Sequence, residues 1–141
     1  MRLSARNVLA GTVTKITKGA VNAEVALALT GGTPLIAIIT NGSIDNLGLK
    51  EGASVFAIIK ASSVLIGTEL HDAKTSARNI MCGTVAKIVE GPVSTEVDVE
   101  VGGGNTISAV ITHESASSLG LAVGGHACTL FKASSVIIGV S

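Results

Sequence analysis

The sequence consists of one segment written twice. Residues 60–64 (Lys-Ala-Ser-Ser-Val) return unchanged as residues 132–136, and residues 4–7 (Ser-Ala-Arg-Asn) return as residues 76–79, both at an offset of 72. Aligned at this offset without any gap, the two copies are identical at 30 of 66 positions. Self-similarity at a fixed period predicts one structural unit per repeat, so the chain is expected to contain two modules of the same fold.

The boundaries and composition of these modules indicate small β domains. We expect modules at residues 1–69 and 76–141, joined by a linker at residues 70–75. Modules this short bury little surface on their own, and only Phe56 and Phe131 supply aromatic bulk. Association between modules or chains is therefore expected. Ala, Val, Ile and Leu with 17 Gly suit short strands joined by tight turns.

Charge and hydropathy argue against several partners. The formal net charge is zero and aromatic residues make up 1% of the chain, whereas nucleic-acid binding usually requires a basic field and stacking aromatics. The longest uncharged run, residues 25–44, contains Gly and Pro turn signals and is not expected to span a membrane. No secretory signal is visible. The sequence therefore predicts a cytoplasmic protein without a nucleic-acid or membrane partner.

Each repeat predicts five strands and a short helical segment. Alternating apolar residues and β-branched residues indicate strands; in the first copy they are expected at residues 8–16, 23–29, 34–40, 54–59 and 63–67. Glycine pairs predict a hairpin turn at residues 30–33, and residues 41–49 predict one or two helical turns ended by Gly48. The expected fold class is all-β with a short helical segment, in the form of two tandem five-stranded OB-like barrels.

The two cysteines do not belong to a feature shared by the repeats. Cys82 aligns with Ala10, and Cys128 aligns with Phe56. Unmatched cysteines at apolar positions are typical of buried small hydrophobes rather than of a disulfide or a metal pair.

Few charges recur between the copies. Of ten basic residues, three pairs recur, namely Arg6/Arg78, Lys15/Lys87 and Lys60/Lys132, and one acidic pair recurs, Glu24/Glu96. A moderately diverged duplication also keeps some charges by chance. Against chance, Arg6 and Lys60 each lie within two residues of a recurring serine.

The recurring side chains form an inventory suited to an oxyanion. Ser, Thr, Lys, Arg and unpaired backbone N–H groups are the donors that such an ion requires. Thr40 and Ser43, repeated as Thr112 and Ser115, lie where the third strand is expected to enter the helical turn, a position with unpaired N–H groups. These hydroxyls also suit simple capping of turns, and the residues alone leave both explanations open.

No catalytic constellation is shared by the repeats. The three histidines, His71, His113 and His126, fall in the linker or opposite Asn41 and Ser54, so none is a shared general base. Metal-ligand spacings such as His-Glu-x-x-His or Cys-x-x-Cys are missing from the sequence. Glu24 and Glu96 are interpreted as solvated or ion-paired side chains. The sequence therefore predicts that the protein is not an enzyme and has no direct ligands for a metal cation.

Several motifs together resemble a known family. Besides the Ser-Ala-Arg-Asn run, each copy contains Gly-x-Val-x-x-Ile, Ile-Thr-x-x-Ser and Lys-Ala-Ser-Ser-Val-x-Ile-Gly, in the first copy at residues 11–16, 39–43 and 60–67. These motifs look like the Mop, or TOBE, module. The tandem arrangement resembles the two-module molbindins, which are cytoplasmic proteins that bind molybdate and tungstate.

The resemblance implies where anions would sit. In this family anions lie between modules, where the Ser-Ala-Arg-Asn run of one module meets the Thr-x-x-Ser and Lys-Ala-Ser runs of its neighbour. The residues implied are Ser4, Arg6, Thr40, Ser43, Lys60, Ala61 and Ser62, and in the second copy Ser76, Arg78, Thr112, Ser115, Lys132, Ala133 and Ser134. For a second kind of site near a threefold axis, the candidates are Gly19, Val21, Gly91 and Val93.

The resemblance further implies a homotrimer with molybdate or tungstate as ligand and no organic cofactor. Three function classes are then in view: a free-standing buffer for storage and homeostasis of the oxyanion, a regulatory anion-sensing module acting on a partner, and a scaffold that only oligomerises. No nucleotide-binding signature or helix-turn-helix pattern occurs in the sequence, which favours the buffer over the regulatory module.

Overall fold

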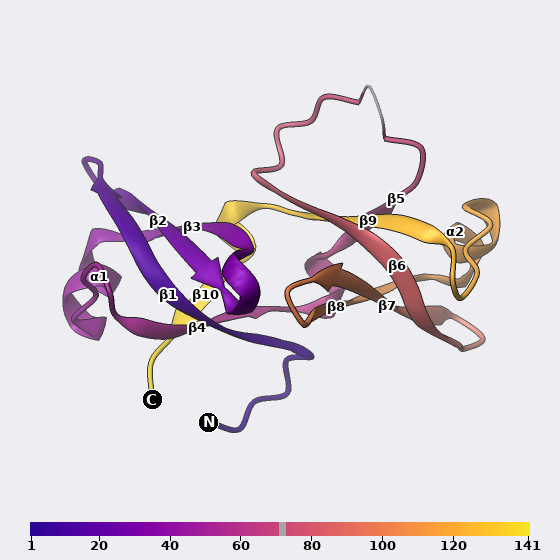
Figure 1. Cartoon of the computed structure of the whole chain (residues 1–141), viewed down its shortest axis with the longest axis horizontal. Coiled ribbons are helices and arrows are strands. Elements are labelled where there is room, and N and C mark those ends of the chain that lie inside the picture. The colour runs from indigo at the N-terminus through magenta and orange to yellow at the C-terminus, as the bar shows by residue number, and fades with distance from the viewer. Residues whose placement is uncertain (71–72) are drawn as a thin grey trace.

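Two curled five-stranded antiparallel sheets lie side by side in the computed structural model, which describes residues 1–70 and 73–141 (Figure 1). The predicted fold class, a mostly β chain with two repeated five-stranded units, is confirmed. Of the linker expected at residues 70–75, residues 71 and 72, and with them His71, lie outside the described residues. None of the helices in the described ranges has both the length and the apolar character needed to cross a membrane.

The first repeat folds much as its sequence pattern predicts. Its elements are β1 (Asn7–Lys18), β2 (Asn22–Leu29), the 3-10 turn η1 (Thr30–Gly32), β3 (Pro34–Thr40), α1 (Asn41–Leu47), β4 (Ser54–Ile59), the 3-10 turn η2 (Ala61–Ser63) and β5 (Leu65–Gly67). The apolar alternation in β2 is real, because Val25, Leu27 and Leu29 are all buried. Helix α1 ends as predicted, with Gly48 in the left-handed conformation that favours glycine at this position.

The second repeat has the same order of elements. They are β6 (Asn79–Glu90), β7 (Ser94–Gly102), β8 (Asn105–Thr112), α2 (His113–Ser118), β9 (His126–Phe131), the 3-10 turn η3 (Ala133–Ser135) and β10 (Ile137–Gly139). The long first strand has a register shift at the same place in both copies, between Val13 and Lys15 in β1 and between Val85 and Lys87 in β6. An extra residue of this kind bends and twists a strand, which helps each sheet to curl.

The two repeats exchange their last strands. The strand order is β10-β4-β1-β2-β3 in one sheet and β5-β9-β6-β7-β8 in the other. In Figure 1 the yellow strand β10 accordingly lies among the indigo and violet strands of the first repeat, whereas β5 lies beside β9. Each sheet is therefore complete only when both repeats are folded.

The hydrophobic core also continues from one repeat into the other. One cluster contains Val25 and Leu27 of the first copy together with Ile107 and Phe131 of the second. The two backbones approach each other closely at Gly31, where an added Cβ atom would lie 2.4 Å from Cα of Gly103. Gly31 also has a φ of +79°, so only glycine satisfies both the backbone conformation and the contact at this position.

A pair of buried asparagines connects the sheets. Asn7 donates from Nδ2 to the carbonyl of Ser108 (2.8 Å), and the N–H of Ser108 donates to Asn7 Oδ1 (2.7 Å). Asn79 makes the equivalent pair with the N–H and carbonyl of Ile36, both at 2.8 Å. Because β3 and β8 are the edge strands of the two sheets, each asparagine pairs an edge that would otherwise expose its backbone groups.

The interpretation of the cysteines as two unconnected buried residues is wrong. Cys82 on β6 lies directly opposite Cys128 on β9, and a disulfide joins them. Cys128 is buried, but Cys82 is exposed. The sequence comparison missed the pair because it asked which thiols recur between the repeats, whereas the two partners here lie on neighbouring strands of one sheet.

Candidate functional site

A cavity of about 310 Å³ gathers most of the predicted anion-binding residues of the first repeat. Its lining residues are Ser4, Ala5, Arg6, Lys60, Ala61, Ser62 and Val110. Two segments more than 50 residues apart in sequence thus meet where β1 begins and β4 ends. Because Val110 belongs to β8, the second repeat closes one side of the cavity.

The backbone around Lys60 forms a helical turn beside this cavity. Lys60 follows β4 in an extended conformation and precedes the turn η2, which is closed by hydrogen bonds from Ser63 N to Lys60 O (2.9 Å) and from Val64 N to Ala61 O (3.3 Å). The first N–H groups of a helical turn have no partner within the turn. Ala61 is buried, so its small side chain seats the turn against the protein while Lys60 and Ser62 stay exposed.

The second repeat has an equivalent arrangement. Lys132 precedes η3 in the same extended conformation, Ala133 is buried, and Ser134 is exposed. Turn η3 packs against β3 just as η2 packs against β8. Ser76 and Arg78 precede β6 as Ser4 and Arg6 precede β1. The same set of donors is therefore available twice per chain.

The recurring arginines already have partners. Arg6 Nη1 forms an ion pair with Glu96, and Arg78 Nη1 lies 2.6 Å from Glu24 Oε1. Each of the two recurring glutamates therefore forms an ion pair with a recurring arginine of the other repeat. This confirms the interpretation of the glutamates as ion-paired. Since both arginine side chains are at least half exposed, each pair adds little stability, but it compensates the arginine charge beside each candidate site.

The recurring threonines and serines cap the short helices. The N–H of Ser43 donates to Thr40 Oγ1 (3.1 Å), and the N–H of Ser115 donates to Thr112 Oγ1 (3.0 Å). Neither threonine–serine pair lines the cavity beside Lys60. Thr112 and Ser115 instead line a separate cavity of about 390 Å³ with Leu65 and Ile66 of β5. Within one chain, therefore, the structure does not bring all the predicted site residues together.

The candidates for a second kind of site lie at hairpin tips. Gly19 and Val21 lie in the tip between β1 and β2, and Gly91 and Val93 lie in the tip between β6 and β7. Each tip is tied to the start of a helix, because Asn41 N donates to Val21 O (2.9 Å) and His113 N donates to Val93 O (3.1 Å). The side chains of Val21 and Val93 are 69% and 80% exposed, which places apolar groups rather than donors at these tips.

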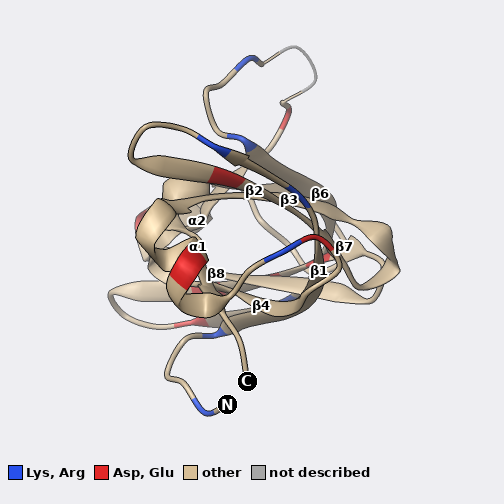
Figure 2. Ribbon diagram, turned by 90° about the vertical axis from the view of Figure 1, so that its left-hand side faces the viewer, with Lys and Arg blue, Asp and Glu red and all other residues tan. Residues whose placement is uncertain are grey.

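Charged residues are spread over many elements. Figure 2 shows Lys and Arg (blue) at both ends of the view and on several strands, interleaved with Asp and Glu (red). No single basic stripe follows one face of the ribbon in this view. This distribution suits compact sites with one or two cations better than a surface that tracks a phosphate backbone.

Sequence reasoning missed two groups of residues. The first group is Asn7 and Asn79. Both belong to the recurring Ser-Ala-Arg-Asn run, but only the folded structure shows that they join the two sheets. The second group is a cluster of three potential metal ligands. One ligand atom from each lies within 4.8 Å of the other two, and the residues are Cys82, His126 and Cys128. Motif spacing alone does not find this cluster because its members come from two strands.

These features define a class: a β protein of two repeated modules with exchanged strands and a small cluster of donors repeated in each module. The sequence pattern of the TOBE domain matches residues 3–66 and 75–138. The chain belongs to the TOBE-domain family, as its motifs predicted.

Several named proteins are similar to this chain. The molybdenum-pterin-binding protein MopA of Rhodobacter capsulatus is 51% identical over 140 residues, and the molybdenum transport protein ModE of Azotobacter vinelandii is 44% identical over 140 residues. Each alignment covers 99% of this chain, but the chain spans only about half of either relative (53% and 52%). A structure of the cytoplasmic molybdate-binding protein ModG with molybdate bound superimposes on all of this chain with a TM-score of 0.97 at 45% identity, and is itself covered completely.

Proposed function

We propose that this protein binds molybdate, and tungstate in the same way, and serves the storage and homeostasis of these oxyanions in the cytoplasm. The observation that carries the proposal is the cavity in which Ser4, Lys60 and Ser62 converge beside the start of η2. The similarity of the whole chain to the molybdate-bound structure of ModG supports the choice of ligand. The ligand acts as cargo, and neither catalysis nor an organic cofactor is part of the proposal.

The donor set explains how a dianion would be held. Lys60 supplies one full positive charge, while serine hydroxyls and backbone N–H groups supply directed hydrogen bonds. Arg6 lines the cavity but is paired with Glu96, so we assign it to shaping the wall and assign the principal charge to Lys60. Lys132 has the same role in the second repeat.

We further propose that each site is completed by a neighbouring chain. Two threonine–serine pairs that cap the short helices lie outside the cavity of Lys60 within one chain, namely Thr40/Ser43 and Thr112/Ser115. Within each pair the two hydroxyls are hydrogen-bonded to each other near the surface (Thr40 Oγ1 and Ser43 Oγ at 2.9 Å, Thr112 Oγ1 donating to Ser115 Oγ at 2.7 Å), which leaves one hydroxyl proton per pair free to donate to an anion. Bringing such a pair from a second chain against the Lys-Ala-Ser run would surround an anion with donors, which is the arrangement that the family resemblance implies.

Apolar rows on both sheets supply a reason for assembly. Ile137, Ile58 and Val8 lie in register across β10, β4 and β1. Leu65, Leu130 and Ile80 occupy the equivalent places across β5, β9 and β6. The outer members of these rows are 37% to 66% exposed. Exposed apolar groups that recur at equivalent positions indicate a contact surface, and we propose that three chains associate into a homotrimer.

The assembly prediction is tested by sedimentation equilibrium at micromolar protein and neutral pH. We expect a mass of about three chains. Val8→Lys combined with Ile80→Lys places charges within both apolar rows and is expected to shift the equilibrium toward smaller species, whereas Val123→Lys, at an exposed position outside the rows, should leave the trimer intact. A wild-type monomer that still binds anion would contradict sites shared between chains.

Ligand discrimination tests the proposed function directly. Molybdate, tungstate and sulfate are tetrahedral dianions of the same charge, so a preference among them must come from cavity size and the reach of the donors. Hydroxyls and N–H groups at strand ends are fixed in position, and a pocket sized for the longer metal–oxygen bonds leaves some of them out of range of sulfate. In calorimetric competition at constant ionic strength, we expect tungstate to displace molybdate at similar concentration and sulfate to compete poorly. Equal competition by sulfate would mean a generic anion site.

A regulatory role is the second candidate. The chain aligns along 99% of its length with only about half of ModE, a protein named for molybdenum transport. A two-module unit of this kind therefore also occurs as part of a longer protein. If this chain acts as a sensor, anion binding should change its affinity for a partner protein, whereas a storage protein should bind and release the anion alone.

A further inference from the structure

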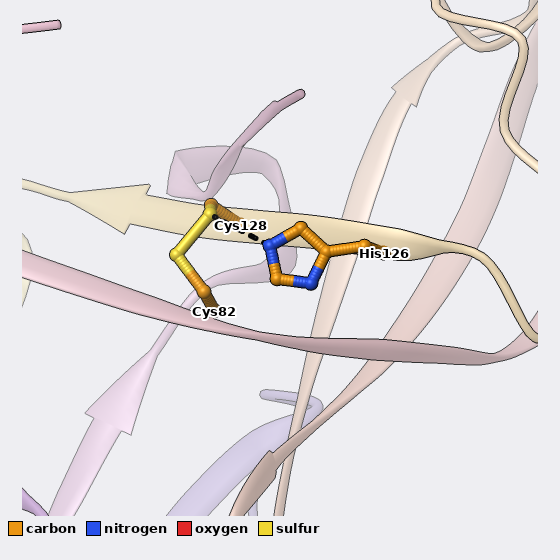
Figure 3. Close-up of side chains that lie close together, drawn as sticks. All are labelled: Cys82, His126 and Cys128. Carbon is orange, nitrogen blue, oxygen red and sulfur yellow. Dashed lines mark hydrogen bonds between the residues drawn. A yellow bond between two sulfur atoms is a disulfide. The ribbon is translucent and has the colours of Figure 1, made fainter. Parts of the chain in front are cut away.

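We propose that Cys82, His126 and Cys128 form a binding site for a thiophilic metal ion, with Zn²⁺ as the expected occupant, and that the disulfide is the oxidised and closed state of this site. The three side chains project from the neighbouring strands β6 and β9 toward one another (Figure 3). Cys128 Sγ lies 3.9 Å from His126 Nε2, and all three potential ligand atoms fall within 4.8 Å of one another.

The geometry requires little rearrangement after reduction. With Zn–S bonds of about 2.3 Å and Zn–N bonds of about 2.0 Å, tetrahedral coordination separates a sulfur from a nitrogen ligand by about 3.5 Å and two sulfurs by about 3.8 Å. The pair Cys128 and His126 is already close to the first separation. Once the two sulfurs are no longer bonded, van der Waals repulsion moves them apart toward the second.

The surroundings of the cluster indicate a fourth position. A cavity of about 180 Å³ is lined by Cys82, His126 and Cys128 together with Glu69, which lies just before the linker. Cys82, His126 and Glu69 are exposed, whereas Cys128 is buried. A Cys2His set with one open side is a known zinc arrangement in which water or an oxygen ligand takes the fourth place. A water molecule would fill it here, because Glu69 lines the cavity but is not among the ligand atoms that lie within 4.8 Å of one another.

The internal repeat supplies a comparison for the cluster. At the offset of 72, Cys82, His126, Cys128 and Glu69 correspond to Ala10, Ser54, Phe56 and Ser141. These four residues likewise line one cavity, on the first sheet, and none of them is a common zinc ligand. The second sheet thus carries three metal-binding side chains at this place, with Glu69 just beyond the end of β5, whereas the equivalent place on the first sheet carries no common zinc ligand.

The chemistry balances with a stated reductant. A phosphine reduces the disulfide with one molecule of water, which yields two thiols and the phosphine oxide by transfer of two electrons. A thiol reductant does the same with two equivalents and becomes a disulfide itself. Binding of the metal ion then displaces the thiol protons, because the thiolate is the ligand. Soft sulfur ligands with one imidazole favour Zn²⁺ over Mg²⁺ or Ca²⁺.

The test uses the full chain in its own assembly state. Protein reduced with a phosphine and freed of reductant without air is titrated with Co²⁺ and then with Zn²⁺. We expect one Co²⁺ per chain, with a thiolate-to-metal charge-transfer band that Zn²⁺ removes. Air-oxidised protein should show no such band. Absence of the band in fully reduced protein, with two thiols per chain verified by titration, would overturn the proposal.

Variants taken from the first repeat separate the ligands from the fold. Cys82→Ala and His126→Ser install the residues found at the equivalent places, Ala10 and Ser54, so the sheet should tolerate both. We expect Cys82→Ala to abolish the charge-transfer band and His126→Ser to weaken Co²⁺ binding at least tenfold. Ser54→Ala in the first repeat is the matched control and should change nothing. Wild-type affinity in the reduced Cys82→Ala variant would also refute the site.

Discussion

Asn79→Ala is expected to lower the free energy of unfolding by about 2–6 kcal/mol, because it leaves two backbone groups of Ile36 without partners at about 1–3 kcal/mol each. Asn79 is only 3% exposed, and it both donates to and accepts from Ile36. Asn7→Ala should cost at least as much, since Asn7 is 1% exposed and bonds to Ile59 as well as Ser108. Urea denaturation at one fixed protein concentration measures the change, because assembly makes stability depend on concentration.

A matched variant shows whether the effect comes from the bonds between sheets. Asn46 lies exposed in α1, so Asn46→Ala removes the same amide without breaking a contact between the repeats and should change stability by less than about 0.5 kcal/mol. If Asn79→Ala unfolds at the same urea concentration as Asn46→Ala, the buried asparagines do not hold the two sheets together.

Local patterns predicted the elements well because local physics decides them. The alternation in β2 reflects one buried face, and the glycine after α1 takes a conformation that other residues adopt at a cost. The periodicity of apolar residues likewise predicted the five strands of each repeat. These features need only the neighbours along the chain.

The exchange of β5 and β10 was not predictable in this way. Residues 65–67 and 137–139 carry the same pattern, so either strand satisfies the edge of either sheet by sequence. Which sheet receives which strand depends on where the chain runs after η2 and η3. Those turns pack against the third strand of the other repeat, and this tertiary contact directs each last strand across.

The candidate site was predicted only in part for a similar reason. The recurrence of residues between the two repeats identified four candidates that the fold places around one cavity, namely Ser4, Arg6, Lys60 and Ser62. Recurrence could not distinguish a side chain that binds a ligand from one that joins the repeats. Arg6 also pairs with Glu96 across the repeats, and Asn7 bonds to the backbone of β8, so both residues have a role in joining the repeats.

Lysine is the side chain on which the proposed anion sites depend most. Arg6 and Arg78 are compensated by glutamates of the opposite repeat. Among the recurring candidate site residues, Lys60 and Lys132 are then the cations that make no ion pair within the described part of the chain. A hydrogen bond to a charged group contributes about 1.5–3 kcal/mol. The double variant Lys60→Ala/Lys132→Ala is therefore expected to weaken molybdate binding by roughly tenfold to 150-fold per site.

Calorimetric titration with molybdate tests this expectation, with Lys50→Ala as the control. Lys50 is exposed and corresponds to Ala122 in the second repeat, so its removal lowers the net charge by one without touching a candidate site and should leave the affinity nearly unchanged. Comparing the variants at two salt concentrations separates a contact from the general field, because screening acts mainly on charges farther apart than the Debye length. A loss as large for Lys50→Ala as for each site lysine would mean that the anion responds to overall charge, and the cavity beside η2 would no longer explain its binding.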